Sequence, residues 1–306
     1  MKSVLVLGGT GMLGSMVTDE LVRRPDIRLT ATWRAAGNTA RRPAVPGVEW
    51  VPFDGADSRL DEALSACGPH QWIINAIGIT KPLIRDDDPR QVEPAIRINA
   101  LLPHAIARVA ETHGARVLQI ATDCVYSGAK GAYIETDVHD ALDVYGKSKS
   151  LGECYAPNTA HLRCSIIGPE PKDFKFLIEW FRSQPAGGRV NGFTNHHWNG
   201  VTTLHFARLC AGIIESEIRL PHLQHVVPEG VITKAGMLHE FAKAYGRTDV
   251  QINETSASSV IDRTLSTATP DLNRQLWQAA GYATLPTVPE MIAEVAKYSY
   301  RFCGVA

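Results

Sequence analysis

Apolar and polar positions form two kinds of pattern over the first half of the chain. Short runs rich in β-branched and other apolar residues alternate with longer stretches in which apolar residues recur every three or four positions. The short runs predict strands at 3–7, 28–32, 48–53, 72–76, 116–121 and 160–163, and the longer stretches predict helices at 12–24, 58–66, 90–113 and 143–156. This alternation is typical of right-handed strand–helix–strand crossovers, so we predict an α/β fold built on a doubly wound parallel sheet.

The pattern loosens after residue 168. Prolines, glycines and the polar segment 195–200 interrupt it, and a further helix is predicted over 202–216. No low-complexity linker and no internal repeat separates the two halves of the sequence. We therefore predict a larger domain over 1–168 packed against a smaller C-terminal lobe over 169–306, with about 190–220 returning to the sheet.

Composition narrows the class of protein. The 306 residues are 44% hydrophobic and 21% charged, with a formal net charge of −1, which fits a globular protein without a positive field for a polyanion. No stretch approaches the roughly 20 apolar residues of a membrane span. Six scattered cysteines without CxxC pairs indicate reduced thiols instead of a disulfide framework or a zinc site. We expect a cytoplasmic protein that binds no nucleic acid, membrane or metal.

A glycine-rich turn follows the first predicted strand. Gly8, Gly11 and Gly14 have the GxxGxxG spacing and lead into the first predicted helix. Glycine permits a sharp turn, lets a pyrophosphate approach the backbone and lets the helix pack close to the sheet, while the free amides of the helix N-terminus bind phosphate. This context predicts a Rossmann-type dinucleotide site, in which Met12 and Leu13 belong to the contact segment.

The end of the second predicted strand bears on the choice of cofactor. It reads Ala31-Thr32-Trp33-Arg34 and carries no acidic residue. A carboxylate there would hold the ribose hydroxyls of NAD and repel a 2′-phosphate, whereas a guanidinium can bind that phosphate through two hydrogen bonds. Arg34 therefore favours NADP(H), with an ordinary surface arginine as the alternative. Asp54, after the third strand, is a candidate adenine contact or simply the first residue of a turn.

Three residues suggest proton-transfer chemistry. Tyr145 and Lys149 lie four positions apart at the start of a predicted helix and so share one face. A tyrosine with a pKa of about 10 is a poor acid at neutral pH, but a neighbouring ammonium lowers that pKa and makes the hydroxyl a usable proton donor to a carbonyl. Thr122 ends the fifth predicted strand, at the edge where parallel sheets bind ligands. The alternative, a threonine that merely ends a strand, would not account for the tyrosine and lysine downstream.

With these residues the chain resembles the extended short-chain dehydrogenase/reductases, and most closely the dTDP-4-dehydrorhamnose reductase branch. The resemblance covers about 3–168 and the region around 190–215. It rests on GGTGMLG at 8–14, NAIG at 75–78, RIN at 97–99, ATDCVYSG at 121–128, YGKSKSLGE at 145–153 and HLRCS at 161–165. The fold that it implies is a Rossmann-type domain with a smaller C-terminal substrate-binding lobe.

The resemblance also implies roles for single residues. Tyr145 would be the proton donor and Thr122 its hydrogen-bonding partner, while Lys149 would hold the nicotinamide ribose and lower the tyrosine pKa. Asn99 resembles the structural asparagine of the family, with the capping of backbone groups near the site as the alternative role. The cofactor contacts that the resemblance adds are Ala76, Gly78 and Asn99. It further implies an NADP(H)-dependent oxidoreductase, a nucleotide-sugar substrate and a homodimer.

The residues after Thr122 bear on the reaction. Relatives that dehydrate sugar nucleotides carry Asp-Glu there, and this chain has Asp123 and Cys124, so dehydration is disfavoured. The 4-keto reductases place a tyrosine in the second position, whereas the epimerase-reductases that form GDP-fucose place an acid/base cysteine there. Cys124 is therefore either an epimerising group or a small buried residue. The candidate substrate contacts are Thr122, Asp123, Cys124 and, in the polar loop 195–199, Asn199.

Three functions remain open on the sequence. The first, which we expect, is NADPH-dependent reduction of the C4 keto group of a nucleotide-activated 4-keto-6-deoxy sugar, as in dTDP-rhamnose biosynthesis. The second is an epimerase-reductase that uses Cys124. The third is a regulatory subunit that binds NADP(H) and a partner without turnover. The retained Thr122, Tyr145 and Lys149 argue against the third function, because a binding subunit has no need of them.

Overall fold

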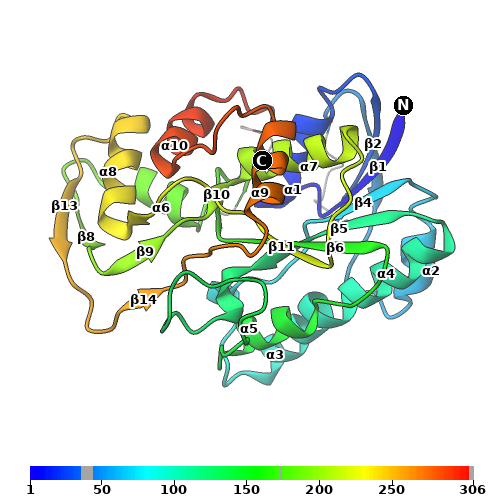
Figure 1. The fold of residues 1–306 in the computed structure, drawn as a ribbon, viewed down its shortest axis with the longest axis horizontal. Coiled ribbons are helices and arrows are strands. Elements are labelled where there is room, and N and C mark those ends of the chain that lie inside the picture. Colours follow the sequence, from blue (N-terminus) through cyan, green and yellow to red (C-terminus); the bar gives the residue numbers. More distant parts are fainter. Residues whose placement is uncertain (36–43, 173, 303–306) are drawn as a thin grey trace.

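The computed structural model describes residues 1–35, 44–172 and 174–302. Its central feature is a seven-stranded parallel sheet in the order β11-β6-β5-β4-β1-β2-β3 (Figure 1). The strands are β1 (Lys2–Leu7), β2 (Ile27–Trp33), β3 (Val48–Pro52), β4 (Trp72–Asn75), β5 (Arg116–Thr122), β6 (Thr159–Cys164) and β11 (Leu223–His225). The chain runs outward from β1 in one direction and then in the other, which confirms the predicted Rossmann-type doubly wound sheet.

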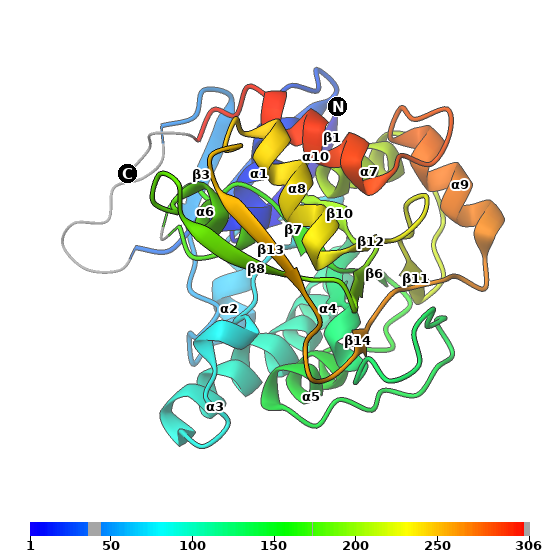
Figure 2. The same ribbon diagram turned by 90° about the vertical axis from the view of Figure 1, so that its left-hand side faces the viewer.

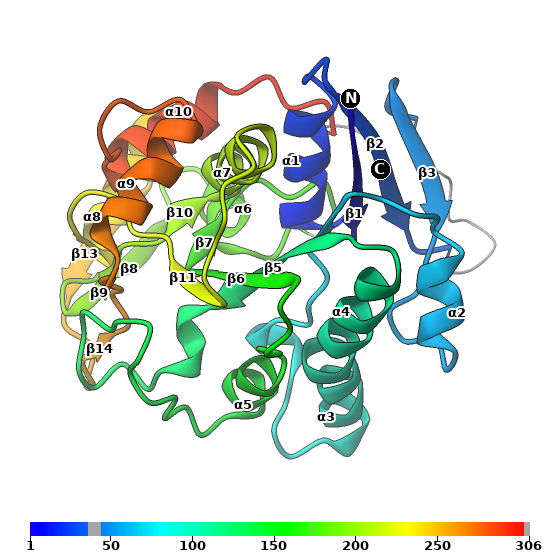
Figure 3. The same ribbon diagram turned by 45° about the vertical axis from the view of Figure 1, so that its right-hand side comes forward.

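Both faces of this sheet are covered by helices. Because side chains alternate along a strand, β1 buries Val4 and Val6 on one face and Leu5 and Leu7 on the other. Helices α1 and α7 cover the first face, and α2, α4 and α5 lie on the second (Figure 3). Their bounds are α1 (Met12–Leu21), α2 (Leu60–Ser65), α4 (Leu102–Thr112), α5 (Val144–Leu151) and α7 (Thr203–Glu215).

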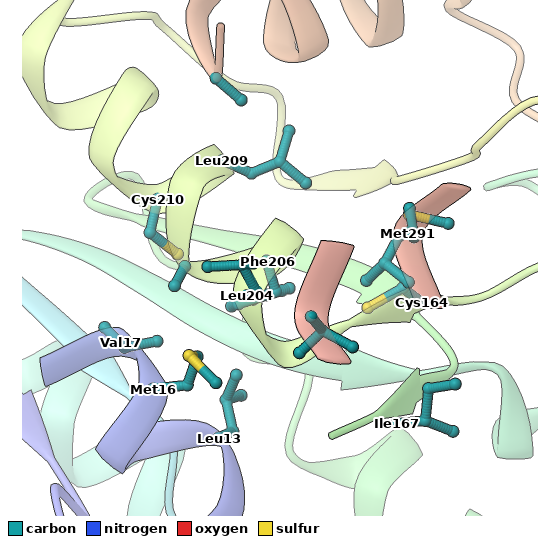
Figure 4. Close-up of a cluster of buried hydrophobic side chains, with 14 of the residues drawn as sticks. Leu13, Met16, Val17, Cys164, Ile167, Leu204, Phe206, Leu209, Cys210 and Met291 are labelled. Carbon is teal, nitrogen blue, oxygen red and sulfur yellow. The ribbon is translucent and has the colours of Figure 1, made fainter. Parts of the chain in front are cut away.

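Helices α1 and α7 pack against each other over the sheet. Leu13, Met16 and Val17 of α1 face the apolar side chains of α7, among them Phe206 (Figure 4). The same buried cluster continues through Cys164 of β6 to Met291 of α10 (Val288–Lys297). The apolar core therefore runs from the sheet into the C-terminal lobe without interruption, and the division at residue 168 stays a prediction.

The C-terminal segment also lies along α1. The Tyr298 hydroxyl donates to the Glu20 carboxylate at 3.2 Å, and the Tyr300 hydroxyl contacts Ser15. Phe302 is buried with its ring edge-on to Trp50. The last described residues of the chain therefore cover part of α1.

The second lobe consists of small sheets and short helices (Figure 2). Strand β8 pairs with β13, β7 with β10, and β9 lies between β12 and β14. The strands are β7 (Ile166–Ile167), β8 (Arg189–Phe193), β9 (His196–Trp198), β10 (Val201–Thr202), β12 (Ile232–Thr233), β13 (Gln251–Thr255) and β14 (Ile261–Asp262), and the further helices are α6 (Leu177–Arg182), α8 (Lys234–Ala244) and α9 (Pro270–Ala279).

The predicted helix over 90–113 is interrupted. It consists of α3 (Pro89–Ile96), a π-helical segment η2 (Arg97–Leu101) and α4. A proline has no amide hydrogen, so Pro103 cannot donate to the carbonyl of Asn99 four residues before it, and the wider π turn accommodates that missing bond. The interruption matters because Asn99 lies in it.

Candidate active site

The glycine turn between β1 and α1 has the geometry that a dinucleotide requires. Gly8 has a φ of +81°, and a Cβ on Gly14 would lie 2.1 Å from the Gly8 carbonyl oxygen, so neither position admits a side chain without movement. Gly11 caps α1 with no side-chain hydrogen bond, which leaves the first amides of the helix free for an anion. The Leu13 side chain is buried in the core, so Leu13 can present only its backbone here.

Arg34 and Asp54 lie beside this turn. Strands β2 and β3 are paired in parallel with Trp33 opposite Pro52, so both residues follow their strands at the same edge of the sheet. Both side chains are exposed. The Asp54 carboxylate accepts the Ala56 amide at 3.0 Å, as expected of a turn residue. The structure thus brings Arg34 close to the site of the dinucleotide and leaves its guanidinium accessible.

Asn99 organises the loop after β4. Its amide side chain accepts from the Ile79 amide at 2.9 Å and donates to the Ile79 carbonyl at 2.8 Å. It also donates to the Ser148 hydroxyl at 3.2 Å, which joins this loop to α5. Ala76 and Gly78 lie in the loop that Asn99 holds. These contacts match the alternative that Asn99 satisfies backbone groups near the site.

The structure brings Thr122 and Tyr145 together. Thr122 is the last residue of β5 and Tyr145 lies in the first turn of α5, which Asp143 caps by accepting the Gly146 amide at 2.8 Å. The two side chains lie close enough for Thr122 to lower the pKa of the Tyr145 hydroxyl. Helix α5 approaches the turn after β5 so closely that a Cβ on Gly146 would lie 2.5 Å from the Cys124 carbonyl oxygen.

Lys149 lies on the same face of α5, deeper in the site. Its ammonium donates to the Ile120 carbonyl at 2.9 Å, and burial lowers its pKa to about 8. The same carbonyl accepts from Gln119 at 3.1 Å, and Gln119 in turn accepts from Asn75 at 2.8 Å. A chain of hydrogen bonds thus fixes the lysine to the ends of β4 and β5.

The surroundings of Tyr145 keep its hydroxyl protonated. Burial raises its pKa well above the usual value, the neighbouring Cys124 adds to this effect, and the nearby Thr122 opposes it. The sequence-based expectation that Lys149 lowers this pKa is therefore not met, because burial outweighs any effect of the ammonium. A protonated phenol is nevertheless the form that can donate a proton to a developing alkoxide.

Asp123 and Cys124 form a tight turn next to this pair. The Thr122 hydroxyl accepts the Cys124 amide at 3.1 Å and lies 3.3 Å from an Asp123 carboxylate oxygen. Burial raises the pKa of both side chains, that of Cys124 to about 12. The Cys124 thiol is therefore protonated at neutral pH and is unsuited to act as a base.

The structure gives Asn199 a different environment from the one expected of a substrate contact. Its amide donates to the Leu265 carbonyl at 2.7 Å and accepts the Leu265 amide at 2.9 Å. Asn195 pairs with both backbone groups of Ala257 in the same way. The segment 195–199 is not the expected loop, because it contains strand β9, and its two asparagines fix the segment 257–265, a structural role that the sequence pattern did not reveal.

Sequence reasoning missed a buried charged network behind the site. The Arg163 guanidinium is fully buried and binds the Glu153 carboxylate at 2.6 Å, His225 at 2.9 Å and the Tyr126 hydroxyl at 2.5 Å. These contacts join the end of α5 to β6 and β11. Glu153 and Arg163 occur in the motifs quoted above, but only the fold shows that they meet.

The family described as RmlD substrate binding domain matches residues 1–300 of the chain. The chain belongs to this family. Methionine adenosyltransferase 2 subunit beta of Danio rerio is 32% identical over 179 residues, which are 54% of this chain and 48% of that relative. A dTDP-4-dehydrorhamnose reductase of Mycobacterium tuberculosis is 25% identical over 202 residues, 62% of this chain and 66% of the relative. The chain spans about half the length of the methionine adenosyltransferase subunits that it matches.

Solved structures with the same fold include a dTDP-4-dehydrorhamnose reductase of Bacillus anthracis in complex with NADP. Its TM-score is 0.72 at 17% identity, with 96% of this chain and 98% of that chain covered. The Bordetella bronchiseptica enzyme WbmG, in complex with NAD and UDP, has a TM-score of 0.74 at 17% identity and covers 99% and 96% of the two chains. At these identities the likeness confirms the fold of the RmlD family member described above.

Three general features complete the site. The described residues contain no helix that is both long and apolar enough to cross a bilayer. Within 1–35, 44–172 and 174–302 no three His, Cys, Asp or Glu residues gather into a candidate metal site. The five cysteines of these ranges are free thiols, and Cys303 lies outside the described residues.

Proposed function

We propose that this protein reduces the C4 keto group of a nucleotide-activated 4-keto-6-deoxy sugar with NADPH. The observation that carries the proposal is the juxtaposition of the Thr122 and Tyr145 side chains at the carboxyl edge of the sheet, which also carries a glycine turn that admits no side chain. Relatives in the family include dTDP-4-dehydrorhamnose reductases, and a solved reductase with this fold binds NADP. A nicotinamide cofactor therefore fits the residues present.

Each candidate residue has a definite task in this proposal. NADPH supplies the hydride to the carbonyl carbon. The Tyr145 hydroxyl donates its proton to the carbonyl oxygen, and the Thr122 hydroxyl holds that oxygen and the phenol in line. The amides at the start of α1 bind the pyrophosphate, and Arg34 binds the 2′-phosphate that distinguishes NADPH from NADH. Lys149, fixed by the Ile120 carbonyl, would hold the ribose of the nicotinamide.

The test is NADPH consumption with a dTDP-4-keto-6-deoxyhexose, with and without an added 3,5-epimerase. Replacing Tyr145 by Phe removes the proton donor and is expected to lower kcat by at least about 100-fold. Tyr155→Phe is the matched control, because Tyr155 follows the same helix but is 89% exposed. Turnover that survives Tyr145→Phe would contradict the proposal.

The need for the epimerase separates the enzymatic alternatives. A dedicated 4-keto reductase consumes NADPH only when the epimerase supplies the 3,5-epimerised sugar. Consumption without it indicates either direct reduction or an epimerase-reductase, and product analysis by NMR distinguishes the two. NADH in place of NADPH is expected to support slower turnover, because Arg34 then has no phosphate to bind.

A second candidate function is a regulatory subunit without turnover. It is favoured by the 32% identity to methionine adenosyltransferase 2 subunit beta over half of the chain. This candidate predicts tight NADPH binding, no keto-sugar reduction, and co-elution with the catalytic subunit of a methionine adenosyltransferase in size-exclusion chromatography. Reduction that depends on Tyr145 would speak for the enzyme. Cytoplasmic location, homodimer formation and the lack of nucleic-acid binding stay predictions.

A further inference from the structure

The segment 298–302, which follows α10, passes beside α1 (Figure 3). Near the end of this helix, the Tyr298 hydroxyl donates to the Glu20 carboxylate at 3.2 Å. Closer to the start of the helix, the Tyr300 hydroxyl contacts the hydroxyl of Ser15, which is fully buried. The order of these contacts shows that the segment runs from the end of α1 toward the glycine turn that precedes the helix.

Ser15 connects Tyr300 to the glycine turn. The Ser15 hydroxyl donates its single hydrogen to the Gly11 carbonyl at 2.6 Å, so the Tyr300 hydroxyl is the donor in its contact with Ser15. The Ser15 amide donates to the same carbonyl at 2.9 Å. The carbonyl and the following amide of a trans peptide point in opposite directions. A Gly11 carbonyl held toward the helix therefore directs the Met12 amide outward, where a phosphate would lie.

Phe302 contacts the support of the turn by a second route. Its ring meets Trp50 of β3 edge-on, with 6.2 Å between the ring centroids, and both side chains are buried. A Cβ on Gly9 would lie 3.0 Å from the Trp50 ring, so the indole packs directly against the backbone of the turn. The Gly9 amide also donates to the Thr32 carbonyl of β2 at 2.9 Å. The turn is thus held by β2, β3 and α1, and the segment 298–302 contacts the last two.

The glycine turn needs support from outside because its own residues supply little. Four of the residues 8–14 are glycines, and a glycine loses more conformational freedom on ordering than any other residue. Amides that are directed at a ligand before it arrives bind it more tightly, because the cost of ordering them has already been met. Contacts that order the turn therefore strengthen cofactor binding without touching the cofactor.

We propose that Tyr300 and Phe302 are positioning residues of the dinucleotide site, which hold the glycine turn in the form that binds NADP(H). This proposal rests on the proposed function in one respect, the placing of the cofactor at the glycine turn. Coupling between two sites is reciprocal. If the contacts of 298–302 strengthen cofactor binding by a given factor, the cofactor stabilises those contacts by the same factor.

The test compares Tyr300→Phe with Tyr298→Phe in the full-length protein. Each variant loses one hydroxyl from the same segment, but only the Tyr300 hydroxyl is joined to the glycine turn through Ser15. In a fluorescence titration with NADPH, Tyr300→Phe is expected to raise the dissociation constant about 3- to 10-fold, the loss typical of one hydrogen bond. Tyr298→Phe is expected to leave it unchanged.

Phe302→Leu tests the second route. It is expected to weaken NADPH binding to a similar extent, because the Trp50 ring loses its aromatic partner. Phe241→Leu, in the core of the second lobe, is the matched control and should bind NADPH like the wild type. Thermal unfolding checks that each variant is folded. Tyr300→Phe removes a single oxygen atom, so it keeps the test decisive even where Phe302→Leu fails to fold.

Hydrogen exchange distinguishes positioning from a purely structural role. Mass spectrometry of the wild-type protein is expected to show that NADPH slows amide exchange in a peptide that contains 298–302, and this protection should be about 3- to 10-fold smaller in Tyr300→Phe. Strand β13 (Gln251–Thr255), in the second lobe, is the internal control and should not respond to NADPH. A role in stability alone would lower the melting temperature and leave exchange in 298–302 independent of NADPH.

Two outcomes would overturn the positioning role. One is a folded Tyr300→Phe variant that binds NADPH as tightly as the wild type, and the other is exchange in 298–302 that does not depend on NADPH. The positioning role and the proposed reaction can also fail separately. NADPH binding that depends on Tyr300 without keto-sugar reduction supports the positioning role and refutes the reductase. Reduction that depends on Tyr145, with an unchanged KM for NADPH in Tyr300→Phe, does the opposite.

Discussion

Tyr145 and Cys124 are neighbours that differ in their suitability for proton transfer at neutral pH. Burial raises the pKa of both groups, so each keeps its proton. For Tyr145 this is the useful state, because reduction of a carbonyl consumes a proton. For Cys124 it is the wrong state, because abstraction of a proton from a sugar carbon needs a thiolate. The same desolvation thus favours a reductase over an epimerase-reductase.

The variant Cys124→Ser tests this difference. Because the thiol has a pKa of about 12 and takes no part in proton abstraction, we expect kcat for keto-sugar reduction to stay within about twofold of the wild type. The measurement is NADPH oxidation together with deuterium uptake at the ring carbons in D₂O, followed by NMR. Cys67→Ser, a buried change remote from the site, is the control. Loss of ring deuteration with reduction retained would instead make Cys124 an epimerising base.

At the scale of elements, the position of α5 depends on its contact with η2. A Cβ on Gly152, which caps α5, would lie 2.0 Å from the Asn99 carbonyl oxygen. That carbonyl belongs to the π-helical segment that Pro103 imposes, and His104 binds the Leu151 carbonyl beside it at 3.0 Å. Helix α5, which carries Tyr145 and Lys149, therefore packs directly against the backbone of η2.

Gly152→Ala is expected to push α5 away from η2. The clash should lower the free energy of unfolding by about 1–3 kcal/mol, as overpacking usually does, and should lower kcat because Tyr145 moves relative to Thr122. Urea denaturation and NADPH oxidation measure the two effects. Gly246→Ala is the control: its φ of +66° brings backbone strain, yet nothing lies within 4 Å and kcat should not change. Wild-type kcat in Gly152→Ala would show that the contact does not position α5.

The sequence predicts elements well where a regular pattern is long enough to be recognised. Six of the seven strands of the main sheet, all except β11, and helices α1, α4 and α7 follow from the spacing of apolar residues, and the glycine turn and the Tyr145–Lys149 pair are local. Strands β7, β10, β12 and β14 have two residues each, too few for a period to show. The contacts of Asn195 with Ala257 and of Arg163 with His225 depend on these short pairings and on β11, and so only the fold reveals them.

At the scale of the whole molecule, buried histidines predict an acid-labile fold. His161 and His225 are fully buried, and burial lowers the pKa of each to about 4, from 6.5 in the unfolded chain. Between these values the unfolded state binds more protons, so stability is fully present above pH 6.5 and is lost as the pH falls toward 4. Each histidine contributes a slope of up to about 1.4 kcal/mol per pH unit.

Urea denaturation at a series of pH values across this window measures the slope. His161→Gln should remove part of it, whereas His113→Gln, at an exposed position after α4, should leave it unchanged. A midpoint that does not move between pH 6.5 and 4.5 would show that the histidines are not buried as neutral groups.

The covering of α1 by α7 and by residues 298–302 has a consequence for biosynthesis. During synthesis, β1, the glycine turn and α1 leave the ribosome before α7 and residues 298–302, which cover α1. Until then the apolar side of α1 that Figure 4 shows has no partner and is exposed to other chains. The glycine turn can therefore hold a fixed shape only once α7 and residues 298–302 have been synthesised, or while another protein shields the apolar side of α1.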